Sequence, residues 1–275
     1  MESSETDDVT APLIPRMVRR GPSNVDESCV EKHDNRLGIR AIIVVVMLER
    51  LTYYSILANL FLFFNDNVYR RNNGSSLNSS KSVLILSAMS WLMCVGGGWI
   101  SDSKLGKRTT LTIGFIFYVI GTCLLFVSAY FLDEITSFSI RALVVYLSLI
   151  IGLVGEGAYK ANISPFGAEQ LSNRGADSIR RFFNYYYASM NVGALLAYSI
   201  VAYFQQNGLS KSNGFLVGYA IPFASISLAF VVFVSARKHY KSLPSQRILG
   251  KVYQIITEAR KNRKRKIRLV MRCHV

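Results

Sequence analysis

Residues 41–64 read AIIVVVMLERLTYYSILANLFLFF, an apolar block that is interrupted in its middle by Glu49 and Arg50. A block of this length can cross a hydrocarbon core of about 30 Å as a helix. Similar blocks follow at about 82–100, 109–132, 140 to beyond 161, 183–204 and 215–234. Backbone groups in lipid have no water to bond, so each block is predicted to be a helix. The sequence therefore predicts an all-α membrane protein with a six-helix bundle over residues 41–236.

The composition supports this class and argues against several others. Of the 275 residues, 51% are hydrophobic and 18% are charged, whereas soluble domains carry about 25% charged residues. A soluble enzyme, a collagen-like chain and a disordered protein are excluded, and no nucleophile–base set or phosphate loop is visible. The four cysteines and three histidines are scattered, so we expect no disulfide framework, no metal site and no enzyme activity.

The distribution of Lys and Arg predicts the orientation in the membrane. With the N-terminus in the cytosol, the cytosolic segments hold 25 of these residues and the opposite segments hold 5. Because positive charge accumulates on the cytosolic side, both termini are predicted to be cytosolic. Residues 1–40 mix both charges with Ser, Pro and Gly, which is typical of a disordered tail. Asn73 and Asn78 begin sequons in the first outer loop and are glycosylation candidates.

Charged residues inside the predicted spans are the first candidates for function. Glu49 and Arg50 lie well inside the first block, and Glu156 and Lys160 lie one turn apart in the fourth. A charge at the centre of a membrane helix costs about 2.5–3.5 kcal/mol on insertion scales. Snorkelling towards the membrane surface is an alternative, strongest for Lys160 near the end of its block. Otherwise buried charges need partners, and Glu49 could pair with Lys160 or with Arg50.

Four motifs resemble signatures of one known family. They read LERLTYY (48–54), GWISDSKLGKRTT (98–110), YKANISPFGAEQ (159–170) and RRFFNYYYASMNVGA (180–194). In this order and spacing they resemble the proton-coupled oligopeptide transporters of the major facilitator superfamily, and the last two are most similar to the peptide/histidine branch. The resemblance implies two six-helix halves with substrate between them, of which this chain resembles the N-terminal half.

The resemblance also implies roles for individual residues. Glu49 and Lys160 match residues that couple proton movement to transport, so protons are the implied coupling ion and no other cofactor is expected. The substrate-binding positions match Arg50, Tyr53, Tyr54 and Asn191. Further motif positions, expected to act through shape, are Asp102, Gly106, Asn162 and Pro165, and Asp102 is expected to cap the turn that follows it.

The chain departs from the family pattern in two ways. Val46 stands where the first acid of the first-helix signature is expected, and it cannot titrate. We hypothesise that Glu156, one turn from Lys160, partly replaces that acid. The second departure is that the chain stops without a seventh span, so it is expected to be a fragment, a splice product or a natural half-transporter that needs a C-terminal half.

Residues 237–275 hold 13 Lys and Arg against one acid, Glu258. This basic linker or tail reflects the positive-inside rule, or else it forms an amphipathic helix on anionic lipid, where each basic residue adds about 1 kcal/mol. Nucleic acid is not an expected partner. Leu13 and Ile14 follow acidic residues and resemble a dileucine sorting signal. With the resemblance, this favours an endosomal or lysosomal membrane, and the plasma membrane is the alternative.

Two functions follow from these observations. The first is a proton-coupled symporter of di- and tripeptides and histidine that exports them from the endolysosomal lumen to the cytosol. The second is a membrane protein without transport activity, whose half-bundle docks another transporter or whose tails recruit regulatory partners. The motifs favour the first function, and the chain length favours the second.

Overall fold

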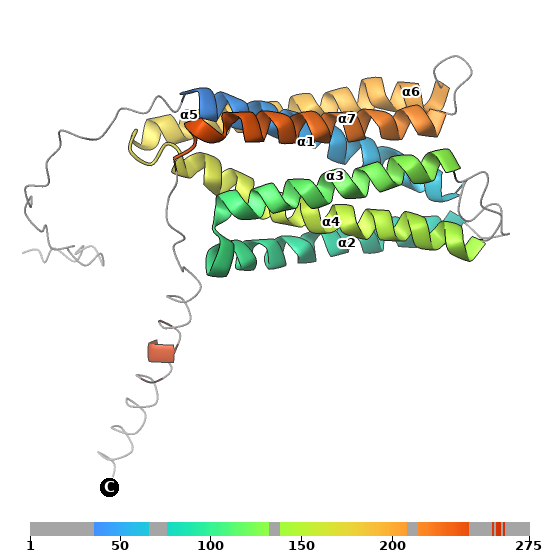
Figure 1. Ribbon diagram of the computed structural model, residues 1–275, viewed down its shortest axis with the longest axis horizontal. Coiled ribbons are helices and arrows are strands. Elements are labelled where there is room, and N and C mark those ends of the chain that lie inside the picture. The colour runs from blue at the N-terminus through green and yellow to red at the C-terminus, as the bar shows by residue number, and fades with distance from the viewer. Residues whose placement is uncertain are drawn as a thin grey trace, which may run out of the picture. The chain divides into compact units, whose positions relative to one another are not determined.

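The computed structural model describes residues 36–65, 76–131, 138–207 and 214–241, together with the isolated positions 255, 257–259 and 261. Six candidate membrane spans lie in these segments, which confirms the predicted all-α fold class. The first four spans contain the helices α1 (Arg36–Phe63), α2 (Ser76–Ile100), α3 (Lys107–Phe131) and α4 (Phe138–Glu169). The last two contain α5 (Ala176–Leu196), α6 (Ala202–Asn207) and α7 (Gly214–Ser235). These helices lie side by side as a bundle (Figure 1).

Some helices extend beyond the apolar blocks from which they were predicted. α1 begins at Arg36, inside the segment predicted to be a tail, and α4 continues through Pro165 to Glu169. The fifth span is continuous because a π-helical turn, Ala197–Val201, joins α5 to α6. Residues 1–35 of the predicted tail lie outside the described part of the chain.

The connection between α2 and α3 is very short. A π-helical turn, Ser101–Leu105, extends α2, and a single residue, Gly106, separates it from α3. Gly106 has a φ of 76°, a conformation that favours glycine. The Gly106 carbonyl accepts bonds from the N–H and the hydroxyl of Thr110, at 3.1 and 3.0 Å. Asp102, expected to cap the next turn, lies within the π-helical turn, and Gly106 directly precedes α3.

Glycines bring α3 and α4 unusually close together. A Cβ on Gly121 would lie 2.5 Å from the Cα of Gly152 and 2.9 Å from the carbonyl oxygen of Ser148. A Cβ on Gly155 would meet the backbone of Gly114 and of Tyr118. Small residues at such seams allow membrane helices to approach until their backbones touch, which gains van der Waals contact. The α3–α4 seam therefore fixes the position of α4 in the bundle.

Two apolar clusters fill the bundle on either side of its middle. One is built around Phe115, Tyr159, Phe166 and Phe233, and the other joins the ends of α1 and α7 with parts of α2, α3 and α4. Along α1, residues up to Val46 belong to the first cluster and residues from Leu60 belong to the second. Glu49 and Arg50 of α1 and Glu156 of α4 lie between the two clusters, and Lys160 follows Tyr159 of the first cluster.

The chain after α7 packs on the bundle for a few residues more than predicted. A 3₁₀ turn, Ala236–His239, follows α7, and the next residue, Tyr240, is buried. Gln170 at the end of α4 accepts a bond from the Lys241 N–H at 2.6 Å and donates to its carbonyl at 3.4 Å. Burial raises the pKa of the Tyr240 phenol well above its ordinary value. Residues 237–241, predicted to begin the tail, are therefore anchored to the bundle.

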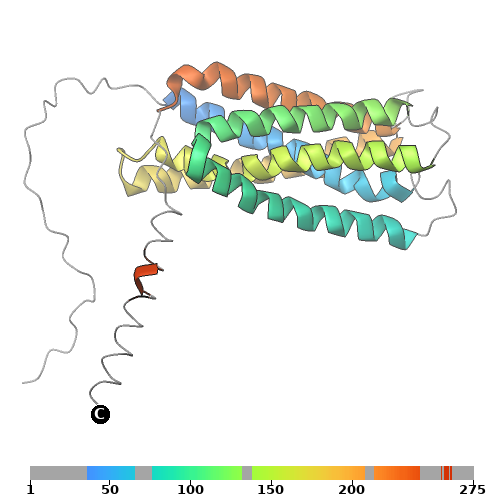
Figure 2. The ribbon, with the colours of Figure 1, turned by 60° about the horizontal axis from the view of Figure 1, so that its bottom comes forward.

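Two spans have much of their surface uncovered. Fewer residues are buried in the spans of α2 and α5 than in the other four, and Figure 2 shows α2 along one edge of the bundle. The large apolar side chains exposed on them include Leu84, Trp91, Leu92, Trp99, Tyr187, Leu195 and Tyr198. Lipid or another set of membrane helices can cover this apolar surface.

We expect Gly121→Ala to destabilise the bundle, because its Cβ would meet only backbone atoms of α4. Overpacking of this kind costs about 1–3 kcal/mol, measurable as a lower midpoint of thermal unfolding in detergent. The matched control is Gly96→Ala, since a Cβ on Gly96 meets nothing within 4 Å. Equal unfolding midpoints for the two variants would contradict the tight α3–α4 seam.

Candidate functional site

The site begins with an acid and a guanidinium that lie next to each other on α1. Glu49 is fully buried and Arg50 is 9% exposed. Arg50 donates from Nε to Oε2 of Glu49 at 2.7 Å, and this pairing offsets part of the cost of burying both charges. Among the described residues, Oε1 of Glu49 has no hydrogen-bond partner. A buried acceptor of this kind can be satisfied by a proton or by an incoming donor.

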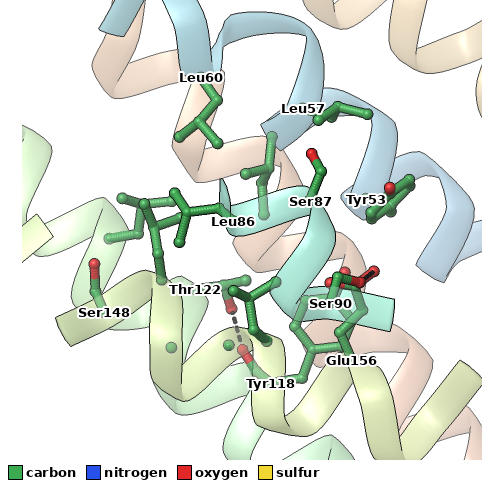
Figure 3. Close-up of a pocket in the computed structure, with 16 residues that line it drawn as sticks. Tyr53, Leu57, Leu60, Leu86, Ser87, Ser90, Tyr118, Thr122, Ser148 and Glu156 are labelled. Carbon is green, nitrogen blue, oxygen red and sulfur yellow. Dashed lines mark hydrogen bonds between the residues drawn. The ribbon is translucent and has the colours of Figure 1, made fainter. Parts of the chain in front are cut away.

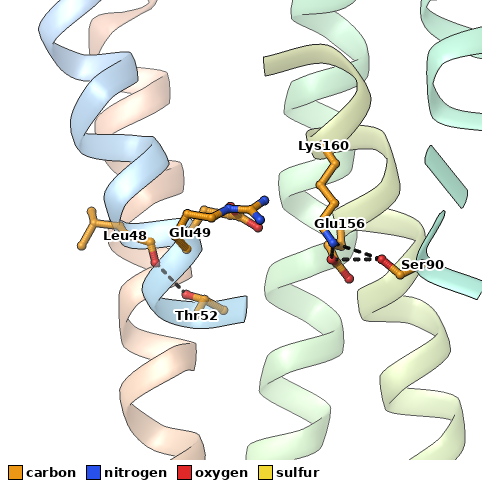
Figure 4. A network of polar contacts seen from close by, with 7 residues as sticks. Leu48, Glu49, Thr52, Ser90, Glu156 and Lys160 are labelled. Atoms are coloured by element: carbon orange, nitrogen blue, oxygen red, sulfur yellow. Dashed lines mark hydrogen bonds and ion pairs between the residues drawn. The ribbon is translucent and has the colours of Figure 1, made fainter. Parts of the chain in front are cut away.

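The second pair lies on α4 and is joined to α2. Lys160 forms an ion pair with Glu156 one turn before it, and their side chains are 11% and 4% exposed. Ser90 of α2 connects the two charges, because its hydroxyl donates to Glu156 Oε1 at 3.1 Å and accepts from Lys160 Nζ at 3.2 Å. Figure 4 shows this triad on the opposite side of the view from Glu49 of α1.

Tyr53 of α1 links the two pairs. Lys160 Nζ lies 3.9 Å from the centroid of its ring, and Arg50 Cζ lies 5.3 Å from the same centroid. Trp91 adds a second aromatic face, 5.5 Å from Lys160 Nζ. Cations within about 6 Å of a ring face are attracted by the ring quadrupole, most strongly where water is excluded. We call Glu49, Arg50, Tyr53, Ser90, Glu156 and Lys160 the charge cluster.

The structure brings together most of the residues expected at a site, with one change in pairing. The ion-pair partner of Lys160 among the described residues is Glu156 rather than Glu49. Ser90 and Trp91 were not predicted, because a serine and a tryptophan in an apolar block carry no signal of their own. Tyr54 lies at the edge, with its ring 5.4 Å from that of Tyr198 in the π-helical turn after α5.

The remaining predicted residues lie elsewhere or have structural roles. Asn191 is exposed on α5 and donates to the Tyr187 carbonyl at 3.0 Å. Asn162 is buried and donates to the carbonyls of Gly97 on α2 and Ala158 on α4, at 3.3 and 2.8 Å, which joins the two helices. Of the glycosylation candidates, Asn78 is exposed in the first turn of α2. Asn73 lies outside the described residues.

A pocket opens beside the charge cluster, with α1, α2, α3 and α4 as its walls. It holds about 570 Å³ of space, which includes its open mouth, and Figure 3 shows the side chains around it. Tyr53, Ser90 and Glu156 belong both to the cluster and to the pocket lining. The charges and the pocket are therefore continuous.

Because Glu156 and Lys160 form an ion pair, we expect the effect of replacing one of them on stability to depend strongly on whether the other is present. Lys160→Met alone leaves a buried carboxylate without its cation, which destabilises a protein by about 3–5 kcal/mol. Adding Glu156→Gln to this variant should recover much of that loss, measured as thermal unfolding of the four forms in a double-mutant cycle. Additive effects would mean that the two side chains do not interact.

Comparison with known proteins agrees with this architecture. The family model described as the POT family matches residues 108–275. Solute carrier family 15 member 3 of Rattus norvegicus is 28% identical over 76% of this chain and 38% of its own length. Solute carrier family 15 member 1 of Homo sapiens is 31% identical over 82% of this chain and 33% of its own length.

Solved structures show the same fold. The POT family transporter PepTSo superposes with a TM-score of 0.63 at 21% identity, over 75% of this chain and 38% of that one. Tetrameric PepTSo2 gives a TM-score of 0.65 at 18% identity, over 82% of this chain and 46% of that one. This chain thus spans about two fifths of the length of the curated relatives it matches. With its family match over more than half of the residues, the chain belongs to the POT family, a family of membrane transporters and not of enzymes.

Proposed function

We propose that this chain forms the N-terminal part of a proton-coupled symporter of short peptides. The observation that carries the proposal is the charge cluster, which places two acids and two bases between the apolar clusters of a membrane bundle. Ionisable residues at such a depth mark ion and substrate pathways. Support also comes from the POT structures of the same fold, several of which are called peptide transporters.

The geometry suggests how the charges act. Lys160 is neutralised by Glu156, so protonation of Glu156 would release a cation towards the pocket. That cation and Arg50 could then hold the carboxylate of a peptide, and the free Oε1 of Glu49 could accept a hydrogen bond from its amino group. In this scheme Glu156 acts in place of the acid that Val46 cannot supply.

The proposal extends to compartment and orientation. The excess of Lys and Arg on one side of the spans favours cytosolic termini. The Leu13–Ile14 motif and the likeness of two signatures to the peptide/histidine branch favour an endosomal or lysosomal membrane, with histidine as a further substrate. The acidic lumen would then drive peptides into the cytosol.

We expect Glu49→Gln to abolish most of the uptake that a pH gradient drives, because this acid is buried beside Arg50 in the cluster. The assay measures labelled dialanine entering proteoliposomes with and without an inward proton gradient. The control is Glu169→Gln, at the end of α4, where Glu169 pairs with Lys107. Unchanged gradient-driven uptake in Glu49→Gln would exclude this residue from coupling.

Glu156→Gln tests the compensating acid directly. We expect its gradient-driven uptake to fall at least about tenfold while exchange of dialanine without a gradient persists, because only the proton-carrying group is removed. A variant with full pH-dependent uptake would show that Glu156 does not replace the missing acid.

A second candidate function is a membrane protein that docks another set of helices without transporting anything. The exposed apolar surfaces of α2 and α5 favour it. Cysteines placed at Leu92 and Leu195, on those surfaces, should form cross-links to a protein partner in native membranes. Cross-linking together with an absence of uptake, even when a C-terminal half is co-expressed, would favour docking over transport.

A further inference from the structure

We propose that Ser90 of α2 is a positioning residue for proton coupling, whose hydroxyl determines how readily Glu156 takes up a proton and where the Lys160 ammonium is held. The inference rests on the proposed function and deepens it, because it gives a neutral side chain on a third helix a part in the coupling. Ser90 acts through Glu156 and does not itself carry the proton.

The hydroxyl of Ser90 is directed differently from that of a comparable serine. Serine hydroxyls in helices commonly donate to a backbone carbonyl three or four residues earlier. Ser128 of α3, 3% exposed, does so at 2.7 Å to the Leu125 carbonyl. Ser90, 2% exposed, donates instead to Glu156 Oε1 on another helix, at 3.1 Å. The bond of Ser90 therefore belongs to the acid of α4 and not to its own backbone.

Ser90, Glu156 and Lys160 form a closed triangle of hydrogen bonds (Figure 4). Lys160 Nζ donates to Ser90 Oγ at 3.2 Å and pairs directly with Glu156, to which Ser90 also donates. A carboxylate that accepts hydrogen bonds is stabilised in its charged form, and such charge-assisted bonds are stronger than neutral ones. The Ser90 hydroxyl therefore adds to Lys160 in keeping Glu156 ionised.

The same hydroxyl can also serve the protonated state. A serine oxygen has one O–H and two acceptor lone pairs, and Lys160 uses one of these lone pairs. A proton that joins the Glu156 carboxylate forms a neutral carboxyl, whose O–H can donate to the second lone pair. The Ser90 O–H then turns to the Leu86 carbonyl, one turn earlier on α2. The triangle gains one positive charge, carried by Lys160, and the acid has a partner before and after proton uptake.

The other ionisable groups around Glu156 stay in place when the Ser90 hydroxyl is removed. Those that interact with Glu156 electrostatically are Glu49 and Tyr53 of α1, Cys94 of α2, Tyr118 of α3 and Lys160 of α4. Arg50 pairs with the first of them. Among the described residues, Ser90 and Lys160 donate hydrogen bonds to Glu156. Because Ser90 is the neutral donor, replacing it removes a bond without changing the charge of the cluster.

The experiment follows the protonation of Glu156 in the purified full chain by infrared spectroscopy in detergent, as the pH is lowered. The protonated-carboxyl band that is missing from Glu156→Gln belongs to Glu156. Ser90→Ala removes a bond that favours the ionised form, so protonation becomes easier. We expect the midpoint of the band to move to higher pH by about one unit, the usual effect of losing a hydrogen bond to a charged group. Equal midpoints in Ser90→Ala and the wild type would overturn the inference.

The matched control is Ser128→Ala, because Ser128 is equally buried, bonds within its own helix and lies outside the pocket lining. It should keep the wild-type midpoint. Ser90→Thr retains the hydroxyl and should also titrate near the wild-type pH. A Ser90→Thr midpoint as high as that of Ser90→Ala would assign the shift to packing and would overturn the role of the hydroxyl.

A further variant covers the case in which Ser90→Ala does not fold. Ser90→Cys, kept in reducing buffer, introduces a side chain of similar size that is a weaker donor. Its midpoint should move in the same direction as that expected for Ser90→Ala. An unmoved midpoint in Ser90→Cys would overturn the inference in the same way.

Uptake of labelled dialanine into proteoliposomes separates this inference from the proposed function. In Ser90→Ala, the pH at which gradient-driven uptake is half-maximal should move together with the infrared midpoint. Wild-type uptake that does not respond to a proton gradient would contradict the proposed function, while a shifted infrared midpoint would still support the role of Ser90. Gradient-driven wild-type uptake with an unshifted midpoint in Ser90→Ala would overturn the inference and leave the proposed function standing.

Discussion

The need to neutralise four charges in the interior of a membrane bundle governs the middle of this structure. Glu49 with Arg50 and Glu156 with Lys160 each form a pair without net charge, which makes their presence between two apolar clusters tolerable. The two pairs are coupled, because the ring of Tyr53 lies close to both cations. A proton or a zwitterion that disturbs one pair would therefore also affect the other pair.

The close helix packing is what places these charges. Gly121 and Gly155 let α3 and α4 touch, Asn162 joins α4 to α2, and a Cβ on Gly193 of α5 would lie 2.9 Å from the Cβ of Arg50. Each contact leaves little freedom for the helix that carries a charged residue. Helices whose backbones are in contact can hold the two charges of an ion pair in place. The space that side chains do not fill beside the pair remains as a pocket.

Much of the fold could be predicted because the relevant signals are local. Long apolar runs indicate the spans, and a charge within such a run stands out against its neighbours. The helix ends were harder to predict: α1 starts before its apolar block, and a π-helical turn extends α2 through Asp102 to Leu105. Four motifs resemble those of a transporter family, and this resemblance pointed to Glu49, Arg50, Tyr53 and Lys160 as site residues. It did not decide which of these side chains pair with one another.

The sequence by itself determined the number of membrane helices, the charged residues within them and the family to which the chain belongs. Only the tertiary structure decided that Lys160 pairs with Glu156, that Ser90 bridges this pair, and that a leucine-lined pocket begins at Tyr53. The physical reason is one of range. Hydropathy and motif spacing are properties of neighbouring residues, whereas pairing and cavities depend on distances between helices, which the glycine contacts set across more than 30 positions of the chain.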